Sequence, residues 1–339
     1  MSPLRDILEH LLERRDLDEA QAEHLLTRLT HPEESPAMAG ALLAALRSKG
    51  VVAQELRGFA RAMRKLARRP NIPEGVRAID IVGTGGDASG SLNISTGTAL
   101  LTAACGFPVV KHGNRSVSSR SGSADLLEAL GLKIPLDEQQ AAACLEAANF
   151  TFLFAPYYHP ATKAISPVRA ALGVRTVFNI LGPLSNPARP PLHVLGAFSL
   201  DVARLMADTI SGLDTERAFV IHGAAGWDEP TPVGSFVLFD VRNGKVTQEE
   251  RHPEDYGLSR CEPSSLGGGD ASHNAAALKA VLSGEDKGPH RDCLLLGAAL
   301  ALEVAGEESS PRDAVARAAE AIDSGAARRT IDTLAKVSA

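Results

Sequence analysis

Two apolar runs that each continue into a polar, glycine-bearing loop constrain this chain more than any other feature. The first run, residues 78–82, leads into Gly-Thr-Gly-Gly-Asp at 83–87, and the second, residues 107–110, leads into Lys-His-Gly-Asn-Arg at 111–115. Both loops run towards the start of a helix. Because an open parallel sheet binds ligands outside the carboxyl ends of its strands, we expect both loops at one sheet edge.

The chemistry of residues 80–125 suits a phosphate ester. Glycines let the backbone of the first loop approach a ligand and present N–H groups to it. Ser95 or Thr96 is expected to cap the next helix, whose N-terminus favours an anion. Asp87 and Asp125 suggest a metal ion between carboxylates and phosphates. Positive charge and hydroxyl hydrogen-bond donors come from a set of basic residues and serines: Lys111, Arg115, Arg120, Ser116, Ser118, Ser119, Ser121 and Ser123.

Each loop alone also fits an ordinary role. A glycine-rich turn after a strand is usually only a turn, and a run of serines is usually a solvated loop. We favour a binding site because two such loops follow consecutive strands, with basic side chains and helix starts between them.

The composition narrows the class of protein. The 339 residues suffice for one large or two smaller domains, and 44% hydrophobic residues support a buried core. A net charge of −6 and 4% aromatic residues argue against nucleic-acid binding. The sequence has no signal peptide, no apolar run of membrane-spanning length and no cysteines at metal-ligand spacing. We therefore expect a cytoplasmic protein that does not bind membranes.

The sequence pattern changes once along the chain. Residues 1–69 place apolar residues at helical spacing, and the prolines of 70–73 indicate a linker. Beyond it, strand and helix patterns alternate. We expect a small helical domain at 1–70 and a larger α/β domain at 74–339, whose central, mostly parallel sheet is flanked by helices.

Three later segments complete the pattern. The adjacent carboxylates Asp228 and Glu229 follow an expected strand at 218–221, which places them at the same sheet edge, although an acidic turn has the same sequence. Residues 237–246 predict a hairpin. The glycines of 267–269 look like a phosphate loop, but they are expected to form a linker before a helix.

Taken together, these motifs resemble the phosphoribosyl pyrophosphate site of the anthranilate phosphoribosyltransferase family of tryptophan biosynthesis. The ordered set of both loops and Asn-Ile-Ser-Thr at 93–96 is far more specific than one glycine motif. The resemblance implies the nucleoside phosphorylase/phosphoribosyltransferase-like fold, with residues 160–187 crossing back to the helical domain. It covers nearly the whole chain and is strongest at 41–50, 78–133, 156–187, 226–230 and 267–306.

The resemblance also implies an activity. Members of this family transfer the phosphoribosyl group of 5-phosphoribosyl 1-pyrophosphate to the amine of anthranilate and release pyrophosphate. It implies Mg²⁺, two ions per subunit, and a homodimer formed through the helical domain. The implied contacts to phosphoribosyl pyrophosphate are Gly83, Gly86, Asp87, Ser91, Asn93, Ile94, Ser95, Thr96, Lys111, His112, Gly113, Asn114, Arg115, Ser116, Val117, Ser118, Ser119 and Ser123.

Other roles follow from the same resemblance. Arg169 is expected to grip the anthranilate carboxylate as a catalytic residue. His112 is expected to accept the proton that the amine sheds, although a structural role in the loop is an equal alternative. The implied anthranilate contacts are Gly83, Asn114 and Arg169, and the implied metal ligands are Ser95, Asp228 and Glu229.

The chain departs from the family pattern at three places. Ser91-Leu92 stands where the family has Thr-Phe, Trp227 where a smaller aliphatic residue is common, and Gly297 where asparagine is usual. Glycine inside a helix costs about 1 kcal/mol relative to alanine. None of these changes removes a charged group, so we expect them to affect acceptor specificity rather than the reaction.

Two other functions remain open at this point. A pyrimidine nucleoside phosphorylase shares the architecture but uses inorganic phosphate without paired magnesium carboxylates, so Asp228, Glu229 and Arg169 count against it. A non-catalytic relative that binds nucleic acid would need a basic surface, which the net charge of −6 opposes.

Overall fold

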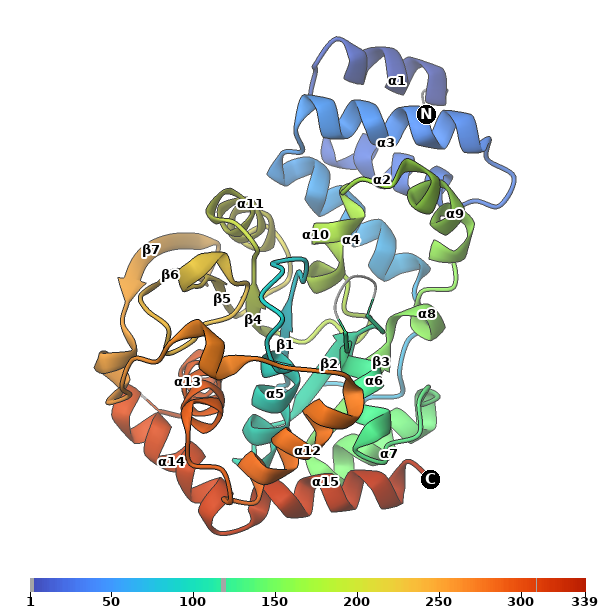
Figure 1. Cartoon of the computed structure of the whole chain (residues 1–339). Helices are drawn as coiled ribbons and strands as arrows, with labels where there is room; N and C mark the ends of the chain where they lie inside the picture. The colour runs from blue at the N-terminus through green and yellow to red at the C-terminus, as the bar shows by residue number, and fades with distance from the viewer. Residues whose placement is uncertain (1–2, 117–119, 309) are drawn as a thin grey trace.

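A computed structural model describes residues 3–116, 120–308 and 310–339. Figure 1 shows a helical lobe at one end of the molecule and an α/β lobe at the other. No helix in the described ranges is long and apolar enough to cross a membrane.

The helical lobe is built from amphipathic helices that bury one face each. Its first four helices are α1 (Leu4–Leu12), α2 (Glu19–Leu29), α3 (Pro36–Lys49) and α4 (Ala53–Leu66). Asp18 begins α2 with a capping box, in which its carboxylate accepts from the N–H of Gln21 at 2.8 Å. Gly58 lets α4 approach α2, because a Cβ there would lie 2.3 Å from the carbonyl oxygen of Glu19.

A connection from the α/β lobe packs onto this helical lobe. It contains α9 (Thr162–Leu172) and α10 (Phe178–Leu181), which lie beside α3 and α4 in Figure 1. Ile165 and Phe178 belong to the same apolar core as the first four helices, and this core continues through α11 (Leu200–Ile210) to one sheet face. The domain boundary expected at 70–74 stays a prediction.

The α/β lobe has one seven-stranded sheet in the order β3-β2-β1-β4-β5-β6-β7. The first five strands are parallel, and the last two are antiparallel. Their bounds are β1 Ile79–Gly83, β2 Val109–Gly113, β3 Phe150–Phe154, β4 Leu192–Gly196, β5 Arg217–His222, β6 Phe236–Arg242 and β7 Lys245–Arg251. The mostly parallel sheet and the hairpin at 237–246 are therefore confirmed.

The strand order reverses between β1 and β4. The chain moves outward from β1 to β2 and β3, and then returns to place β4 on the other side of β1. Gly83 pairs with Gly196 at the carboxyl ends of these two strands. Such a switch point is where open α/β sheets form their ligand crevice.

Helices cover the sheet on both faces. The other helices of this lobe are α5 (Ile94–Ala104), α6 (Ser123–Ala129), α7 (Glu138–Ala148), α8 (Ala155–Tyr158), α12 (Ala271–Leu282), α13 (Pro289–Ala305), α14 (Pro311–Asp323) and α15 (Ala326–Val337). Of these, α5, α7 and α13 pack directly on strands, while α14 and α15 pack on α5. Short 3₁₀ turns lie at Gly182–Leu184, Ala224–Gly226, Pro253–Tyr256 and Pro263–Leu266. Gly297 allows α13 to approach α5, because a Cβ there would lie 2.5 Å from Thr98 Oγ1. Asp270 caps α12, so the glycines of 267–269 lead directly into a helix, as expected.

Two local expectations need correction. Strand β2 runs to Gly113 rather than ending at 110, because its pairing with β3 continues to Gly113 opposite Phe154. Lys111 and His112 therefore lie in the strand. The expectation that Ser95 or Thr96 caps α5 is wrong, since the helix begins at Ile94 and both residues lie in its first turn.

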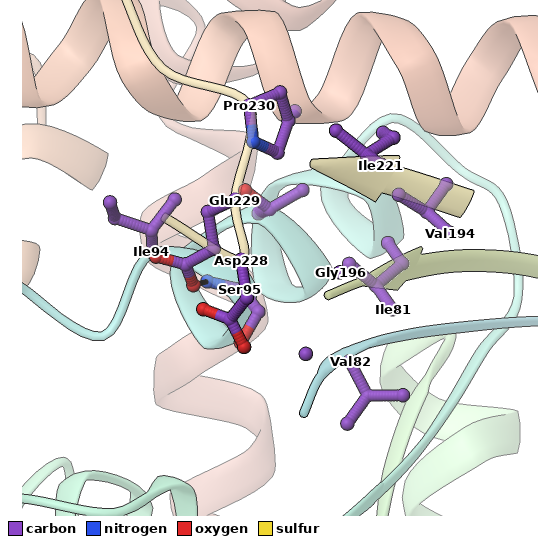
Figure 2. A pocket seen from close by; sticks show the side chains of 13 residues that line it. Ile81, Val82, Ile94, Ser95, Val194, Gly196, Ile221, Asp228, Glu229 and Pro230 are labelled. Atoms are coloured by element: carbon purple, nitrogen blue, oxygen red, sulfur yellow. Dashed lines mark hydrogen bonds between the residues drawn. The ribbon is translucent and has the colours of Figure 1, made fainter. Parts of the chain in front are cut away.

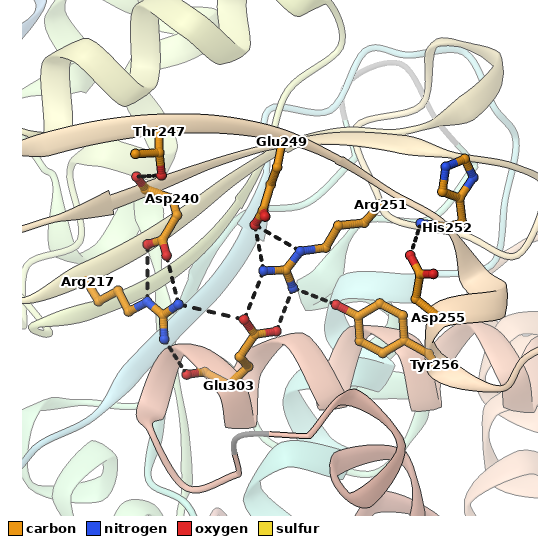
Figure 3. Close-up of polar contacts among 9 residues, drawn as sticks. All are labelled: Arg217, Asp240, Thr247, Glu249, Arg251, His252, Asp255, Tyr256 and Glu303. Atoms are coloured by element: carbon orange, nitrogen blue, oxygen red, sulfur yellow. Dashed lines mark hydrogen bonds and ion pairs between the residues drawn. The ribbon is translucent and has the colours of Figure 1, made fainter.

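A charge network fastens the antiparallel edge of the sheet to α13 (Figure 3). Arg217 binds Asp240 with two hydrogen bonds of 3.1 and 2.8 Å. Arg251 binds Glu303 with two of 2.5 and 2.9 Å, and it also donates to the Tyr256 hydroxyl at 2.7 Å. Both arginines are largely buried, so their charges need carboxylate partners. Each has two, because Arg251 also pairs with Glu249 at 2.6 Å and Arg217 also lies 3.7 Å from Glu303.

We predict that Glu303→Gln lowers the free energy of unfolding by about 2 kcal/mol, because it removes the buried charge that pairs with both Arg217 and Arg251. Denaturant unfolding measures the change. The matched control is Glu250→Gln on β7, an exposed carboxylate without an ion pair among the described residues, which should change stability by less than about 0.5 kcal/mol. Equal losses in the two variants would contradict the role of this network.

Candidate active site

The acidic loop after β5 lies directly over the ends of β1 and β4. A Cβ on Gly83 would lie 2.2 Å from Asp228 Oδ2, and a Cβ on Gly196 would lie 1.5 Å from the Asp228 carbonyl oxygen. Only glycine at these two strand ends leaves space for the loop. Figure 2 shows Ser95, Asp228 and Glu229 gathered beside the strand residues Ile81 and Val194.

The glycine loop of residues 83–87 is tied to this acidic loop. Gly85 N–H donates to Asp228 Oδ2 at 2.5 Å, and the Thr84 hydroxyl lies 3.4 Å from the same oxygen. In return, the Asp228 N–H donates to Asp87 Oδ2 at 3.3 Å. Gly85 and Gly86 adopt φ values of +68° and +77°, which glycine reaches without steric cost.

Glu229 connects the same loop to the start of α5. Its Oε1 accepts from the Ser95 N–H at 2.9 Å, in the first turn of the helix. Buried Lys111 reaches Ser95 from β2, with Nζ 3.4 Å from the hydroxyl, and it also donates to the Ile81 carbonyl. The structure thus brings together Ser95, Lys111, Asp228 and Glu229 from three separate segments: α5, β2 and the acidic loop.

Burial disfavours the ionised form of the two carboxyl groups in this cluster. Burial, reinforced by the neighbouring Asp87 carboxylate, raises the pKa of Asp228 to about 7. Burial and the neighbouring Asp228 raise the pKa of Glu229 above its ordinary range. Burial also lowers the pKa of Lys111 to about 8, despite nearby Asp80 and Glu229. A divalent cation would favour the ionised form of both carboxyls.

The residues present fit a magnesium ion that is shared with a substrate. Mg²⁺ is usually held by one or two carboxylates, with phosphates and water completing the shell. In the described ranges no group of three or more His, Cys, Asp or Glu side chains forms a ready-made metal cage. Asp228 and Glu229 provide two carboxylates, while a bound phosphate would have to supply further ligands.

A cavity of about 20 Å³ lies beneath the acidic loop. Its walls include Thr98 and Gly297 on the helices and Ile221 on β5. The volume is enough for one water molecule. Trp227 and Leu92 are 6% and 2% exposed, so two of the three departures from the family pattern are buried side chains rather than an open wall.

The loop after β2 is organised differently from expectation. Arg115 forms an ion pair with Asp125 at 2.9 Å and a bidentate pair with Glu128 at 2.6 and 2.7 Å. Asp125 also accepts from the backbone N–H groups of Ser116 and Gly122. The suggestion that Asp125 takes part in a metal site is therefore not supported, since its carboxylate holds the start of α6. Val117, Ser118 and Ser119 lie outside the described residues.

Asn93 and its neighbours bridge the two loops to α12. Asn93 Nδ2 donates to the Ser121 carbonyl at 3.0 Å, while its Oδ1 accepts from Asn274 at 2.9 Å. The hydroxyl of Ser91 lies 3.1 Å from that of Ser89, which in turn donates to Asp87. These bonds fix the segment between the glycine loop and α5.

His112 lies in a buried position that keeps its imidazole neutral. Its Nδ1 lies 3.3 Å from the Gly182 carbonyl oxygen, and its ring centroid is 5.0 Å from that of His159. Burial, with a smaller effect of His159, lowers the pKa of His112 to about 3. An imidazole with this pKa is a poor proton acceptor at neutral pH, so its surroundings favour the structural alternative.

Arg169 stands apart from the carboxylate cluster, on α9. Its guanidinium lies 4.9 Å from the centroid of the Phe178 ring, and burial lowers its pKa. Among the described residues its guanidinium has no ion pair or hydrogen-bond acceptor. A half-buried arginine without a carboxylate partner is suited to bind an anionic ligand.

Several residues of the site escaped the sequence reasoning. Buried Asp80 on β1 accepts from Asn186 Nδ2 at 2.8 Å and from the His112 N–H at 3.2 Å. These two bonds join β1 to β2 and to the segment that precedes β4. Burial raises the pKa of Asp80 to about 6. Gly196 was also missed, although a glycine that ends an apolar strand, as Gly83 does, was a usable signal.

The fold and the site define a two-domain glycosyl transferase. Residues 5–67 match the glycosyl transferase family helical bundle domain, and residues 75–328 match the a/b domain of the same family. The chain is 45% identical over 335 residues to an anthranilate phosphoribosyltransferase of Rubrobacter xylanophilus, covering 99% of this chain and 97% of the relative. It is 46% identical to one of Desulforudis audaxviator, covering 98% and 95%.

Solved structures agree with this assignment. Anthranilate phosphoribosyltransferase of Thermus thermophilus superimposes with a TM-score of 0.91 at 40% identity, over 97% of this chain and 98% of that one. The Saccharomyces cerevisiae enzyme, in complex with PRPP and Mg, gives a TM-score of 0.89 at 27% identity, over 99% and 97%. The chain belongs to the anthranilate phosphoribosyltransferase family, which confirms the resemblance and the fold class.

We predict that Asp228→Asn stabilises the metal-free protein at pH 8 and makes its stability less dependent on pH. The folded pKa is about 7, above the ordinary value of about 3.9. The folded state therefore binds the additional proton between these values, and wild-type stability falls as the pH rises through about 4 to 7. Asparagine carries no charge to bury.

Thermal unfolding at pH 5 and pH 8, without Mg²⁺, measures this effect. The matched control is Asp332→Asn on α15, whose carboxylate is exposed and pairs with Arg328. Finding Asp228→Asn less stable than wild type at pH 8 would contradict the unfavourable burial of this carboxylate.

Proposed function

We propose that this protein transfers the phosphoribosyl group of 5-phosphoribosyl 1-pyrophosphate to the amine of anthranilate. The bond from C1 of the ribose to the pyrophosphate oxygen breaks, a bond from C1 to the amine nitrogen forms, and the amine loses a proton. The observation that carries the proposal is the buried pair Asp228 and Glu229, held against the glycine loop and the start of α5. Relatives at about 45% identity that carry this activity in their names support it.

The donor substrate is assigned to the two loops at the switch point. In the glycine loop, Gly86 and Asp87 supply backbone N–H groups that have no acceptor among the described residues. Asn93–Thr96 supplies the start of a helix, and both features favour phosphate oxygens. Lys111 adds positive charge from β2. For the remaining implied contacts, from Asn114 to Ser119 and at Ser123, the assignment rests on the resemblance.

Magnesium is assigned to the carboxylate pair. Asp228 and Glu229 would hold it, with Ser95 beside a second ion, so that each subunit takes two. When bound, Mg²⁺ neutralises the negative charge that grows on the departing pyrophosphate. The raised pKa values of both carboxyls support this assignment, because a cation would compensate the charges that burial disfavours.

Arg169 is assigned to the acceptor. It would bind the anthranilate carboxylate, with Asn114 and the Gly83 backbone facing the ring. An arylamine attacks as the neutral species, so no strong base is needed before bond formation. We assign His112 a structural role on account of its low pKa. Much of the rate would come from positioning two reactants across the cleft.

We also propose a homodimer formed through the helical lobe, in the cytoplasm. Leu12 at the end of α1 and Val174 after α9 are 60% and 50% exposed, and both lie on that lobe. Apolar side chains at such positions are suited to bury against a second copy. Sedimentation of the purified protein measures the oligomeric state.

The reaction is tested by mixing the protein with anthranilate, phosphoribosyl pyrophosphate and Mg²⁺ and following the loss of anthranilate fluorescence. Loss that requires Mg²⁺ and disappears in the double variant Asp228→Asn/Glu229→Gln is expected. The control, Glu33→Gln/Glu34→Gln, changes an adjacent acidic pair between α2 and α3 and should keep the activity. Phosphorolysis of a pyrimidine nucleoside without loss of anthranilate would instead identify a nucleoside phosphorylase.

We predict that Arg169→Gln raises the KM for anthranilate about tenfold or more and leaves the KM for phosphoribosyl pyrophosphate nearly unchanged, because it removes a charge-assisted bond to the acceptor alone. Steady-state kinetics with each substrate varied in turn measures both constants. Lys163→Gln, an exposed change on the same helix, is the control. An equal rise in both constants for Arg169→Gln would rule out the assigned role.

A further inference from the structure

Arg175 lies in the connection between α9 and α10 and contacts three separate parts of the molecule. Its Nη2 donates to the carbonyl oxygen of Gly86 in the glycine loop. Its guanidinium carbon lies 4.1 Å from the centroid of the Phe198 ring, just after β4. Its own carbonyl accepts from Arg47 Nη1 on α3 at 2.5 Å. A single residue therefore joins the helical lobe, the connection and the glycine loop.

The bond to Gly86 fixes the direction of the next N–H group. In a trans peptide the carbonyl and the following N–H point in opposite directions, so holding the Gly86 carbonyl also sets the direction of the Asp87 N–H. Within the described ranges, neither the Gly86 N–H nor the Asp87 N–H donates to a protein acceptor. Both donors are left for a ligand.

The opposite side of the glycine loop is already fixed. The Thr84 N–H donates to the Gly196 carbonyl at 3.0 Å, and the Thr84 hydroxyl accepts from the Phe198 N–H at 3.2 Å. Gly85 is held by Asp228. These contacts come from β4 and the acidic loop, whereas Arg175 holds Gly86 from the side of the connection.

Packing alone does not hold Arg175 in place. Its side chain is exposed, and it borders a pocket of about 270 Å³ whose walls include Arg47, Phe198 and Val202. The stacking on Phe198 and the bond to Gly86 therefore determine where the guanidinium lies. A planar guanidinium makes both contacts at once, which a lysine ammonium does not.

We propose that Arg175 is a positioning residue for the donor substrate. It holds the Gly86 carbonyl so that the Asp87 N–H stays aimed at a phosphate oxygen, and it links this loop to the connection that carries Arg169. The inference rests on the proposed function, because it assigns phosphoribosyl pyrophosphate to this loop. It predicts a change in donor binding rather than in acceptor binding.

The test compares Arg175→Ala and Arg175→Lys with wild type. Arg175→Ala is expected to raise the KM for phosphoribosyl pyrophosphate about tenfold, the effect of losing one hydrogen bond that orders a binding group. The KM for anthranilate and kcat should each change by less than about threefold. Arg175→Lys should give an intermediate value, since an ammonium can still donate to Gly86.

The control is Arg204→Ala on α11. Arg204 also places its guanidinium over a phenylalanine ring, 5.5 Å from the centroid of Phe239, but its ion pair is with Asp208 on its own helix. The Arg204→Ala variant should keep both KM values at the wild-type level. A loss of activity in Arg204→Ala equal to that in Arg175→Ala would overturn the proposal.

Measuring the binding of phosphoribosyl pyrophosphate directly tests the role of Arg175 independently of the transfer reaction. Trp227 is the single tryptophan of the chain and precedes Asp228, so its fluorescence can follow titration with phosphoribosyl pyrophosphate and Mg²⁺. A Kd about tenfold weaker in Arg175→Ala, with an unchanged Tm, supports the positioning role even if wild type transfers nothing to anthranilate. An unchanged Kd, a fall in Tm with equal rises in both KM values, or no donor binding by wild type would overturn it.

Discussion

The approach of the acidic loop to the ends of β1 and β4 is the constraint on which the rest of the site depends. It requires two glycines, because any side chain on Gly83 or Gly196 would collide with Asp228. Once the loop is in place, the carboxylates of Asp228 and Glu229 are buried side by side, and burial raises both pKa values. The fold therefore maintains an arrangement of charges that a cation and a phosphate group would stabilise.

A second requirement concerns the connection that carries Arg169, the residue that we assign to the acceptor. This connection must be held in place relative to the sheet edge that carries the acidic loop. The helical lobe, the connection between β3 and β4, and one face of the sheet share a continuous apolar core through α11. Arg169 and Arg175 both lie on that connection, so the same segment carries the residue that we assign to anthranilate and the residue that holds the glycine loop.

The sequence predicted what is local in the chain and missed what depends on distant partners. The sequence revealed the strands that end in glycine loops and the adjacent pair Asp228 and Glu229. Each of these features is a short, continuous stretch, so it can be recognised from neighbouring residues in the chain. The sequence did not reveal contacts that arise from packing between separate elements. These include the partners of Arg115, the burial of His112 and the contact of Arg175 with Gly86. Even the cap of α5 was misplaced, because its boundary follows from bonds across the site rather than from serine or threonine propensity.

The most direct measurement is an anomalous difference map from crystals grown with Mn²⁺ and phosphoribosyl pyrophosphate. We predict peaks within bonding distance of the carboxylates of Asp228 and Glu229, with the pyrophosphate on the glycine loop and the Gly86 carbonyl still bound by Arg175. A metal site elsewhere in the cleft, or a substrate bound without contact to the glycine loop, would contradict it.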